Sequence, residues 1–192
     1  MDLGIKGRHA LVCGGSKGLG HAAAEALANE GVSLTLVARS VDALKSAAED
    51  LSARFDVDAR YVAADITTPE GRADVLAACP DPDILVTNPG VRQTPADFRT
   101  LTRADWDHWF EAHCFSSLEL IQKTVPGMSE RKFGRVVNIS VSNIKFPQVN
   151  FAHSHAARVA LSGAIASMVR ELVAHNVVIN SVLPGFFDTD AL

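Results

Sequence analysis

Short apolar runs alternate with longer segments of helical periodicity along most of the chain. The runs are rich in β-branched residues, and such nearly continuous apolar strands are typical of a parallel sheet covered by helices on both faces. We predict strands at residues 9–13, 33–38, 59–64, 83–88, 134–140 and 176–183, and helices near residues 19–30, 41–54, 69–78, 103–126 and 152–174. Right-handed crossovers between them give an open, doubly wound α/β sheet, which binds ligands at the carboxyl ends of its strands.

Composition indicates a single domain over residues 1–192. The chain is 47% hydrophobic and carries a net charge of −4, so it has enough apolar material for one core. Acidic and basic residues are scattered, and we find no basic stripe, secretory leader or apolar stretch of about 20 residues. We therefore expect a cytoplasmic protein that binds neither nucleic acid nor a membrane.

The three cysteines are too far apart for a zinc-binding spacing. Cys13, Cys79 and Cys114 lie in different predicted elements and form no C-x-x-C pair. We expect buried thiols and no metal site, because the histidines also lack a carboxylate or thiol partner at a recognisable interval.

A glycine-rich turn follows the first predicted strand. Gly14, Gly18 and Gly20 have the spacing G-x-x-x-G-x-G before an amphipathic helix. Glycines in such a turn let the backbone approach a pyrophosphate at the positive helix N-terminus, although a turn without a ligand is the simpler alternative. The residues predicted to contact a dinucleotide here are Gly14, Ser16, Lys17, Gly18, Leu19 and Gly20.

The end of the second strand favours NADP(H) over NAD(H). A carboxylate that binds the ribose of NAD is expected about 20 residues after the turn, but the chain has Arg39 there. Arg39 and Lys17 together suit a 2′-phosphate. The alternative is that both are solvated surface cations.

Five motifs in order resemble the short-chain dehydrogenase/reductase family over essentially the whole chain. They are "GGSKGLG" at 14–20, "AADIT" at 63–67, "DILVTNPG" at 83–90, "GRVVNIS" at 134–140 and "NSVLPGFFDT" at 180–189. The resemblance implies a Rossmann fold and further cofactor contacts at Asp65, Ile66, Asn88, Gly90, Arg158, Pro184, Gly185 and Thr189.

The catalytic positions depart from that family. Its reductases use a Tyr-x-x-x-Lys pair, a serine and an asparagine, whereas alignment on the motifs places Ser154 at the tyrosine and Arg158 at the lysine. His113 stands at the asparagine, and the serine position falls on Val141 between two serines. The chain thus resembles atypical 3-oxoacyl-acyl-carrier-protein reductase-like members that lack the Tyr-x-x-x-Lys pair.

The replacement residues still offer workable chemistry. Arg158 can stabilise negative charge but relays no proton, and Ser154 can hold a carbonyl oxygen. Imidazole is well matched to proton transfer near neutrality. Each histidine alone is typical of a capping or packing residue, whereas three near one pocket favour contact of at least one with the ligand. The candidate catalytic residues are Ser154, Arg158, His155, His153, His113, Ser140 and Ser142.

The resemblance also carries an expectation about the end of the chain and its assembly. Members of the family run to about 250 residues, a usual size for one α/β domain. This sequence ends earlier, at "FFDTDAL", so we expect the family's last strand and substrate-covering flap to be missing. Either a partner subunit covers these surfaces or the sequence is part of a longer protein. The helices near 103–126 and 152–174 form the family's dimer interface, which implies a homodimer or homotetramer.

Three functions agree with these residues. The favoured one is an NADP(H)-dependent oxidoreductase that reduces a carbonyl substrate, either a small molecule or an acyl thioester such as a 3-oxoacyl group. The alternatives are a catalytically inactive nucleotide-binding or scaffold homologue, and a non-redox lyase or dehydratase on the same fold.

Overall fold

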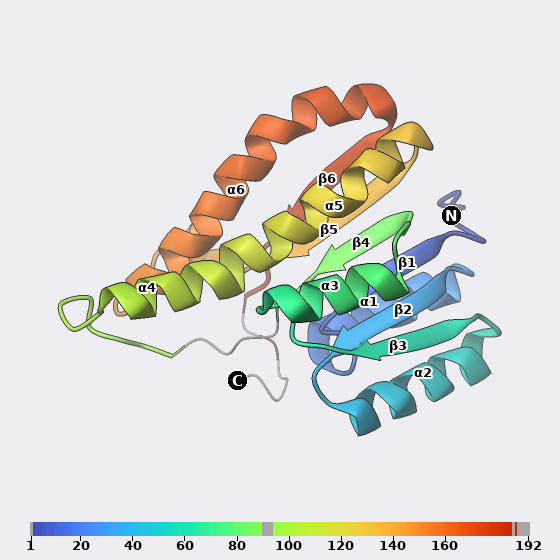
Figure 1. The fold of residues 1–192 in the computed structure, drawn as a ribbon, viewed down its shortest axis with the longest axis horizontal. Coiled ribbons are helices and arrows are strands. Elements are labelled where there is room, and N and C mark those ends of the chain that lie inside the picture. Colours follow the sequence, from blue (N-terminus) through green and yellow to red (C-terminus); the bar gives the residue numbers. More distant parts are fainter. Residues whose placement is uncertain (1, 90–93, 186, 188–192) are drawn as a thin grey trace.

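The six predicted strands form one parallel sheet (Figure 1). The computed structural model describes residues 2–89, 94–185 and 187. In chain order the strands are β1 (His9–Cys13), β2 (Ser33–Ala38), β3 (Ala59–Ala63), β4 (Ile84–Thr87), β5 (Gly134–Ile139) and β6 (Val177–Val182). Across the sheet they run β3-β2-β1-β4-β5-β6, the order of doubly wound dinucleotide-binding sheets. The predicted fold class is confirmed, and the strand order reverses between β1 and β4.

Helices connect the strands as the periodicity predicts, with one difference. They are α1 (Gly18–Asn29), α2 (Val41–Phe55), α3 (Pro69–Ala78), α4 (Arg103–Phe110), α5 (Ser116–Glu130) and α6 (Ala152–Leu172). The segment predicted as one helix near 103–126 consists of α4, a π-helical turn at Glu111–Phe115, and α5, which continues past Pro126. Short 3₁₀ turns lie at Ser142–Ile144 and Val173–His175.

Polar side chains mark where several helices begin. Ser40 and Thr68 each accept a backbone hydrogen bond at the start of α2 and α3, and Pro69 opens α3 with its fixed φ. At α4, Thr102 and Asp105 satisfy each other's backbone N–H groups in a capping box. These residues fix the helix starts near the carboxyl edge of the sheet.

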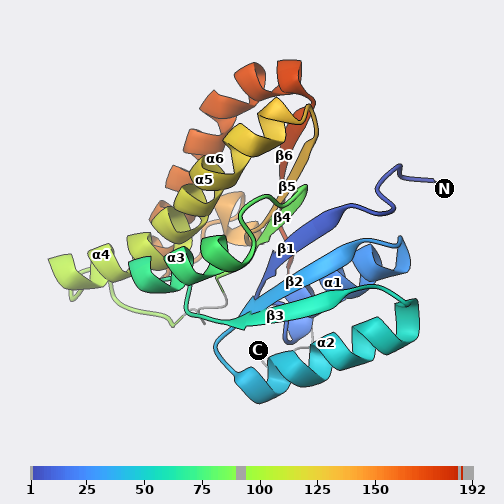
Figure 2. The same ribbon diagram turned by 45° about the vertical axis from the view of Figure 1, so that its right-hand side comes forward.

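A hydrophobic core lies on each face of the sheet. Along β1, Ala10 and Val12 belong to one core while Leu11 and Cys13 belong to the other, as the two-residue period of a strand requires. The first core is completed by α1 and α2, and the second by α3, α5 and α6. Figures 1 and 2 show α5 and α6 beside the β4–β6 half of the sheet and α2 beside β2 and β3.

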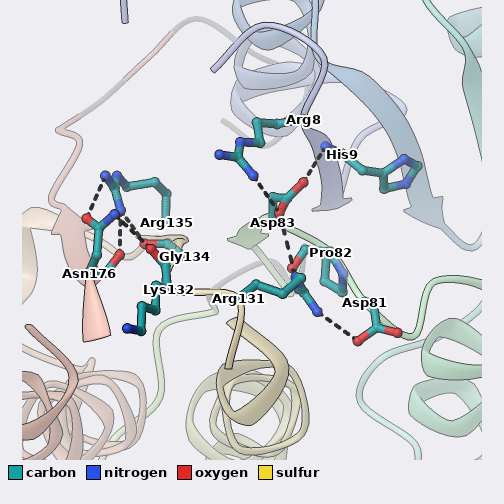
Figure 3. Close-up of polar contacts among 10 residues, drawn as sticks. All are labelled: Arg8, His9, Asp81, Pro82, Asp83, Arg131, Lys132, Gly134, Arg135 and Asn176. Carbon is teal, nitrogen blue, oxygen red and sulfur yellow. Dashed lines mark hydrogen bonds and ion pairs between the residues drawn. The ribbon is translucent and has the colours of Figure 1, made fainter. Parts of the chain in front are cut away.

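Polar contacts hold the amino ends of the strands together (Figure 3). Asp83, just before β4, accepts hydrogen bonds from the His9 backbone N–H at 3.1 Å and from Nη1 of Arg8 at 3.4 Å. Nη1 of Arg135 donates to the Asn176 carbonyl oxygen at 2.8 Å and ties the start of β5 to that of β6. This edge is thereby fixed, opposite the carboxyl edge that carries the candidate site.

The three cysteines are buried and form no disulfide, as the sequence predicts. Burial raises the pKa of Cys13 to about 12, so its thiol stays protonated at neutral pH. Within the described residues, no helix is both long and apolar enough to cross a membrane.

Candidate active site

The glycine turn between β1 and α1 has no room for a side chain at Gly14 or Gly20. A Cβ at Gly14 would lie 2.6 Å from Nδ2 of Asn88, and one at Gly20 would lie 2.3 Å from the Gly14 carbonyl oxygen. Gly14 and Gly18 also have positive φ values of 68° and 59°, which glycine adopts without strain. The turn therefore brings the first backbone amides of α1 to the surface beside the end of β4, which is the arrangement that a pyrophosphate requires.

Two cations flank this turn. Lys17 and Arg39 are both exposed, Lys17 immediately before α1 and Arg39 immediately after β2. Ser16 in the turn and Leu19 at the start of α1 are half-buried. Because β1 and β2 are parallel neighbours, their carboxyl ends bring Arg39 to the same edge as the turn.

Other predicted cofactor contacts follow β3 and β6. Oδ1 of Asp65 accepts hydrogen bonds from the backbone N–H and the hydroxyl of Thr67, at 3.0 and 2.8 Å, and the neighbouring Ile66 is buried. The Pro184 carbonyl oxygen accepts a hydrogen bond from the Ser142 N–H at 2.9 Å, with Gly185 exposed beside it. Two further predicted contacts, Gly90 and Thr189, lie outside the described residues.

Arg158 is a buried cation in the second turn of α6. Its side chain lies one helical turn from Ser154, with Nε 3.4 Å from the serine Oγ, and the two residues are only 8% and 1% exposed. Burial lowers the pKa of Arg158 to about 10, which still leaves the guanidinium charged at neutral pH. In the part of the chain that the structure describes, no carboxylate pairs with Arg158. A buried charge without a counter-ion is costly, so this position suits an anionic or strongly polar ligand.

His113 lies on the π-helical turn beside this pair. Burial, reinforced by the charge of Arg158, lowers the pKa of His113 to about 2, so the ring is neutral at neutral pH. Its ring stacks on Trp109 with centroids 5.2 Å apart and an interplanar angle of 18°. A π-helical turn inserts one extra residue into a helix and is frequent at functional sites.

The two candidate histidines of α6 lie in different surroundings. His153 is fully buried, with its ring centroid 4.5 Å from that of Trp109. Burial lowers the pKa of His153, although the Thr94 backbone acts in the opposite direction. His155 is half-buried and faces a separate pocket. The structure therefore places His153 with His113 in one aromatic cluster around Trp109, and His155 apart from it.

The two serines that flank the family's serine position lie at the end of β5. Ser140 is 5% exposed and its N–H donates to the Val182 carbonyl oxygen at 2.9 Å. Ser142 is half-buried at the start of a 3₁₀ turn. Both are therefore held by β6 and the segment that follows it.

Sequence reasoning missed two polar features beneath the site. Thr87 donates to Asn138 at 3.0 Å, and Asn138 donates to Ser181 at 3.3 Å, so a line of hydrogen bonds crosses the ends of β4, β5 and β6. Arg72 on α3 is buried and forms ion pairs at 2.7 Å with Glu111, the first residue of the π-helical turn, and with Glu119 on α5. The sequence did contain a signal for each: Asn138 interrupts an apolar strand, and Arg72 lies on the inner face of a predicted helix.

The strand order, the close-packed glycine turn and the buried cation together define a dinucleotide-binding protein of the doubly wound class. Residues 8–192 match the family model described as short chain dehydrogenase, and the chain belongs to that family.

Relatives with known sequences and structures agree with this assignment. The chain is 31% identical over 186 residues to the uncharacterized oxidoreductase YvaG of Bacillus subtilis, covering 96% of this chain and 70% of the relative. It is 31% identical over 192 residues to 3-oxoacyl-acyl-carrier-protein reductase FabG of Vibrio cholerae, covering 98% and 77%. The crystal structure of L-sorbose reductase from Gluconobacter frateurii, complexed with NADPH and L-sorbose, superposes with a TM-score of 0.92 at 31% identity, covering 99% and 73%.

Proposed function

We propose that this chain is an NADP(H)-dependent oxidoreductase that reduces a carbonyl group, with Ser154 and Arg158 in place of a tyrosine and a lysine. The observation that carries the proposal is the buried guanidinium of Arg158 beside the Ser154 hydroxyl, without a carboxylate partner in the described residues. A polar ligand bound there would satisfy a charge that the described residues leave without a carboxylate.

The residues present fit the cofactor. The turn at Gly14 and the first amides of α1 would hold the pyrophosphate, and Lys17 with Arg39 would hold the 2′-phosphate. Arg158 would donate to the ribose hydroxyls at the nicotinamide end. When bound, NADPH supplies a hydride to the carbonyl carbon. Support comes from the NADPH complex of L-sorbose reductase and from an NADPH-dependent relative, BacG of Bacillus subtilis, at 29% identity.

The side chains of this protein orient the carbonyl and stabilise charge. The Ser154 hydroxyl donates a hydrogen bond to the carbonyl oxygen, and Arg158 stabilises the negative charge that develops there. Arg158 keeps its proton, because its pKa of about 10 leaves it charged at neutral pH. His113 is neutral with a pKa of about 2, so it can serve as a hydrogen-bonding group but not as an imidazolium acid. The proton therefore comes from a bound water or another histidine, of which His155 is the one outside the buried aromatic cluster.

The proposed substrate is a carbonyl compound, either a small molecule or an acyl thioester. Its support is the similarity to relatives named as 3-oxoacyl-acyl-carrier-protein reductases, from Aquifex aeolicus and Vibrio cholerae. We also propose assembly as a homodimer or homotetramer through the helices near 103–126 and 152–174, on which Phe115 and Val159 expose apolar surface.

NADPH consumption against a panel of ketones, aldehydes and 3-oxoacyl thioesters tests the function. We expect turnover by the wild-type protein and a loss of kcat/KM of about 100-fold or more in Arg158→Ala, because a donor to the developing oxyanion is removed. Arg170→Ala, also on α6 but in its last turn, is the matched control and should retain activity.

Two outcomes would overturn this function. NADPH binding without turnover of any carbonyl would favour a nucleotide-binding homologue that is not a catalyst. That alternative draws on the lowered pKa values of His113 and His153, because burial disfavours the imidazolium acid at both positions. Conversion of a substrate without net oxidation or reduction would instead favour a lyase or dehydratase.

A further inference from the structure

Arg72 is a buried cation that belongs to none of the predicted cofactor or catalytic positions. It lies on α3, which packs against α5 (Figures 1 and 2), and its side chain is 5% exposed. Nη1 donates to Oε1 of Glu111 at 2.7 Å and to the Ile66 carbonyl oxygen at 2.9 Å, while Nε donates to Oε2 of Glu119 at 2.7 Å. One guanidinium thus joins the loop after β3, the π-helical turn and α5.

Charge balance alone does not require this arrangement. A single carboxylate neutralises a guanidinium, yet Arg72 contacts two carboxylates and a carbonyl oxygen. The planar guanidinium donates only in the directions of its fork, so each added contact fixes a position rather than a charge. The contacts of Arg72 therefore set where Glu111 lies relative to Ile66.

The loop after β3 is joined to the first turn of α3. The Thr68 hydroxyl donates to the Asp65 carbonyl oxygen at 3.0 Å and accepts from the Gly71 N–H at 3.1 Å. The two backbones are so close at Gly71 that a Cβ there would lie 2.1 Å from the Asp65 carbonyl oxygen. Displacement of this loop therefore displaces the start of α3 and, with it, Arg72.

The same loop lies on the side of the sheet that is proposed to hold the adenosine half of NADPH. β3 is the neighbour of β2, and the end of β2 carries Arg39, the proposed partner of the 2′-phosphate. Asp65 and Ile66 are predicted cofactor contacts in this loop. Bound adenosine would therefore contact the segment whose carbonyl oxygen Arg72 holds.

The other end of the link is the turn that carries His113. Glu111 is the first residue of this π-helical turn, and the His113 ring stacks on Trp109 with centroids 5.2 Å apart. π-helical turns are rare, and the same segment can also continue as an ordinary α-helix, which would rotate the side chains that follow. The contact between Arg72 and Glu111 thus favours the arrangement that brings His113 beside Arg158.

We propose that Arg72 is a positioning residue that links the adenosine half of the cofactor site to the π-helical turn, so that binding of adenosine aligns His113 beside Ser154 and Arg158. The contacts to Ile66 and Glu111 use the same nitrogen, Nη1, so a shift of the Ile66 carbonyl moves the donor to Glu111. The inference rests on the proposed function, because it takes the adenosine half of NADPH to bind at the loop after β3.

Adenosine 2′,5′-bisphosphate tests the link, because it fills the adenosine half of the site without the nicotinamide. Trp109 is one of two tryptophans in the chain, and its indole N–H signal in heteronuclear NMR spectra reports on the stack with His113. We expect the bisphosphate to shift this signal in the full wild-type chain, and the shift to be lost in Arg72→Met. Glu111→Ala should also lose it, and this variant keeps Glu119 as the counter-ion of Arg72 if Arg72→Met fails to fold.

The matched control is Val75→Ala, one turn further along α3. Val75 is fully buried in the core, so its truncation destabilises the protein through a cavity without removing a contact of Arg72. Val75→Ala should keep the bisphosphate-induced shift of Trp109.

Turnover gives a second measurement. Reduced nicotinamide mononucleotide carries the hydride without the adenosine half of NADPH. Adding the bisphosphate should raise kcat/KM for this truncated cofactor by about fivefold or more in the wild type and in Val75→Ala, which is the lower end of the usual coupling between sites. In Arg72→Met and Glu111→Ala the increase should be less than about twofold.

The outcomes separate this inference from the proposed function. A Trp109 shift that is lost in both variants and kept in Val75→Ala supports the link even without turnover, in which case only the reductase function fails. Turnover with NADPH, together with equal bisphosphate effects in the wild type and Arg72→Met, overturns the link and leaves the function standing. Equal losses in Arg72→Met and Val75→Ala would attribute the effect to stability and overturn the link, as would absence of any bisphosphate binding.

Discussion

At the scale of single residues, the site combines buried polar side chains that lack a partner in the described residues with glycines at which no larger residue fits. Arg158 is buried and charged without an acid in the described residues, while His113 is buried with no hydrogen-bond partner on either ring nitrogen there. Gly14 and Gly20 are positions that a methyl group cannot enter. The buried polar side chains indicate a bound ligand, and the glycines indicate the backbone turn that binds it.

Gly20→Ala should impair both folding and NADPH binding. The new Cβ would lie 2.3 Å from the Gly14 carbonyl oxygen, so the turn must move. We expect a loss of about 1–3 kcal/mol in the free energy of unfolding, as for other overpacked sites, together with weaker NADPH binding. Urea denaturation and a binding titration would measure the two effects.

The matched control for this change is Gly163→Ala on α6. A Cβ at Gly163 meets nothing within 4 Å, and replacing an exposed helical glycine with alanine should stabilise by about 0.4–1 kcal/mol. Equal effects at the two glycines would show that the close approach at Gly20 has no consequence.

The depressed pKa of His113 predicts acid sensitivity. The unfolded chain protonates this ring near its ordinary pKa of 6.5, whereas the folded protein keeps it neutral down to about 2. The unfolded state therefore binds the extra proton, and stability is lost as the pH falls below 6.5. Between pH 7.5 and 5.5, His113 should account for a loss of about 1 kcal/mol.

His113→Asn should remove that part of the pH dependence, as measured by urea denaturation at both pH values. His175→Asn changes an exposed histidine and should leave the dependence as in the wild type. If His113→Asn kept the full wild-type loss of stability between pH 7.5 and 5.5, His113 would not be the buried neutral group responsible for it.

At the scale of elements, hydrophobic periodicity predicted the strands well but not the break between α4 and α5. All six strands were located to within two residues, because their apolar runs fill a sheet that is covered on both faces. A π-helical turn has no such signature. It depends on tertiary contacts from α3 and α6, which a local pattern does not contain. The candidate site was also predicted only in part. The spacing of its glycines is visible in the sequence. The separation of His153 from His155 is not, because it depends on where Trp109 packs.

Arg72 should be the residue that stabilises this turn. It is buried, it pairs with Glu111 and Glu119, and its Nη1 also donates to the Ile66 carbonyl oxygen at 2.9 Å. Arg72→Met should lower the free energy of unfolding by about 2 kcal/mol, because it removes hydrogen bonds to charged groups. The NMR signals of His113 should shift as the turn loosens.

Arg72→Lys tests whether geometry or charge matters here, and it should recover less than half of the loss because lysine lacks the forked donors. Arg103→Met removes an exposed ion pair with Asp107 and serves as the control, with no measurable change expected. Full recovery by lysine would contradict a role for the bidentate geometry.

At the scale of the whole molecule, the amino and carboxyl ends of the strands form two edges of the sheet that differ in their polar contacts. The amino edge is closed by ion pairs and hydrogen bonds around Asp83, Arg131 and Arg135. The carboxyl edge carries the glycine turn, the exposed cations and the pocket that His155 faces. Such a division places the satisfied polar contacts at one edge and keeps the opposite edge for the ligand.

The helices near 103–126 and 152–174 provide the last prediction, which concerns assembly. Phe115 and Val159 are 43% and 41% exposed on neighbouring segments of the same helical layer. In a two-fold interface each substituted residue occurs on both subunits, so an added carboxylate is introduced twice and must be desolvated twice. Val159→Asp should therefore convert the oligomer to monomers in sedimentation velocity experiments. Val41→Asp, an exposed valine on α2, should leave the oligomer intact. A wild-type chain that sediments as a monomer at every concentration would contradict the proposed assembly, whereas dissociation by both variants would place the interface elsewhere.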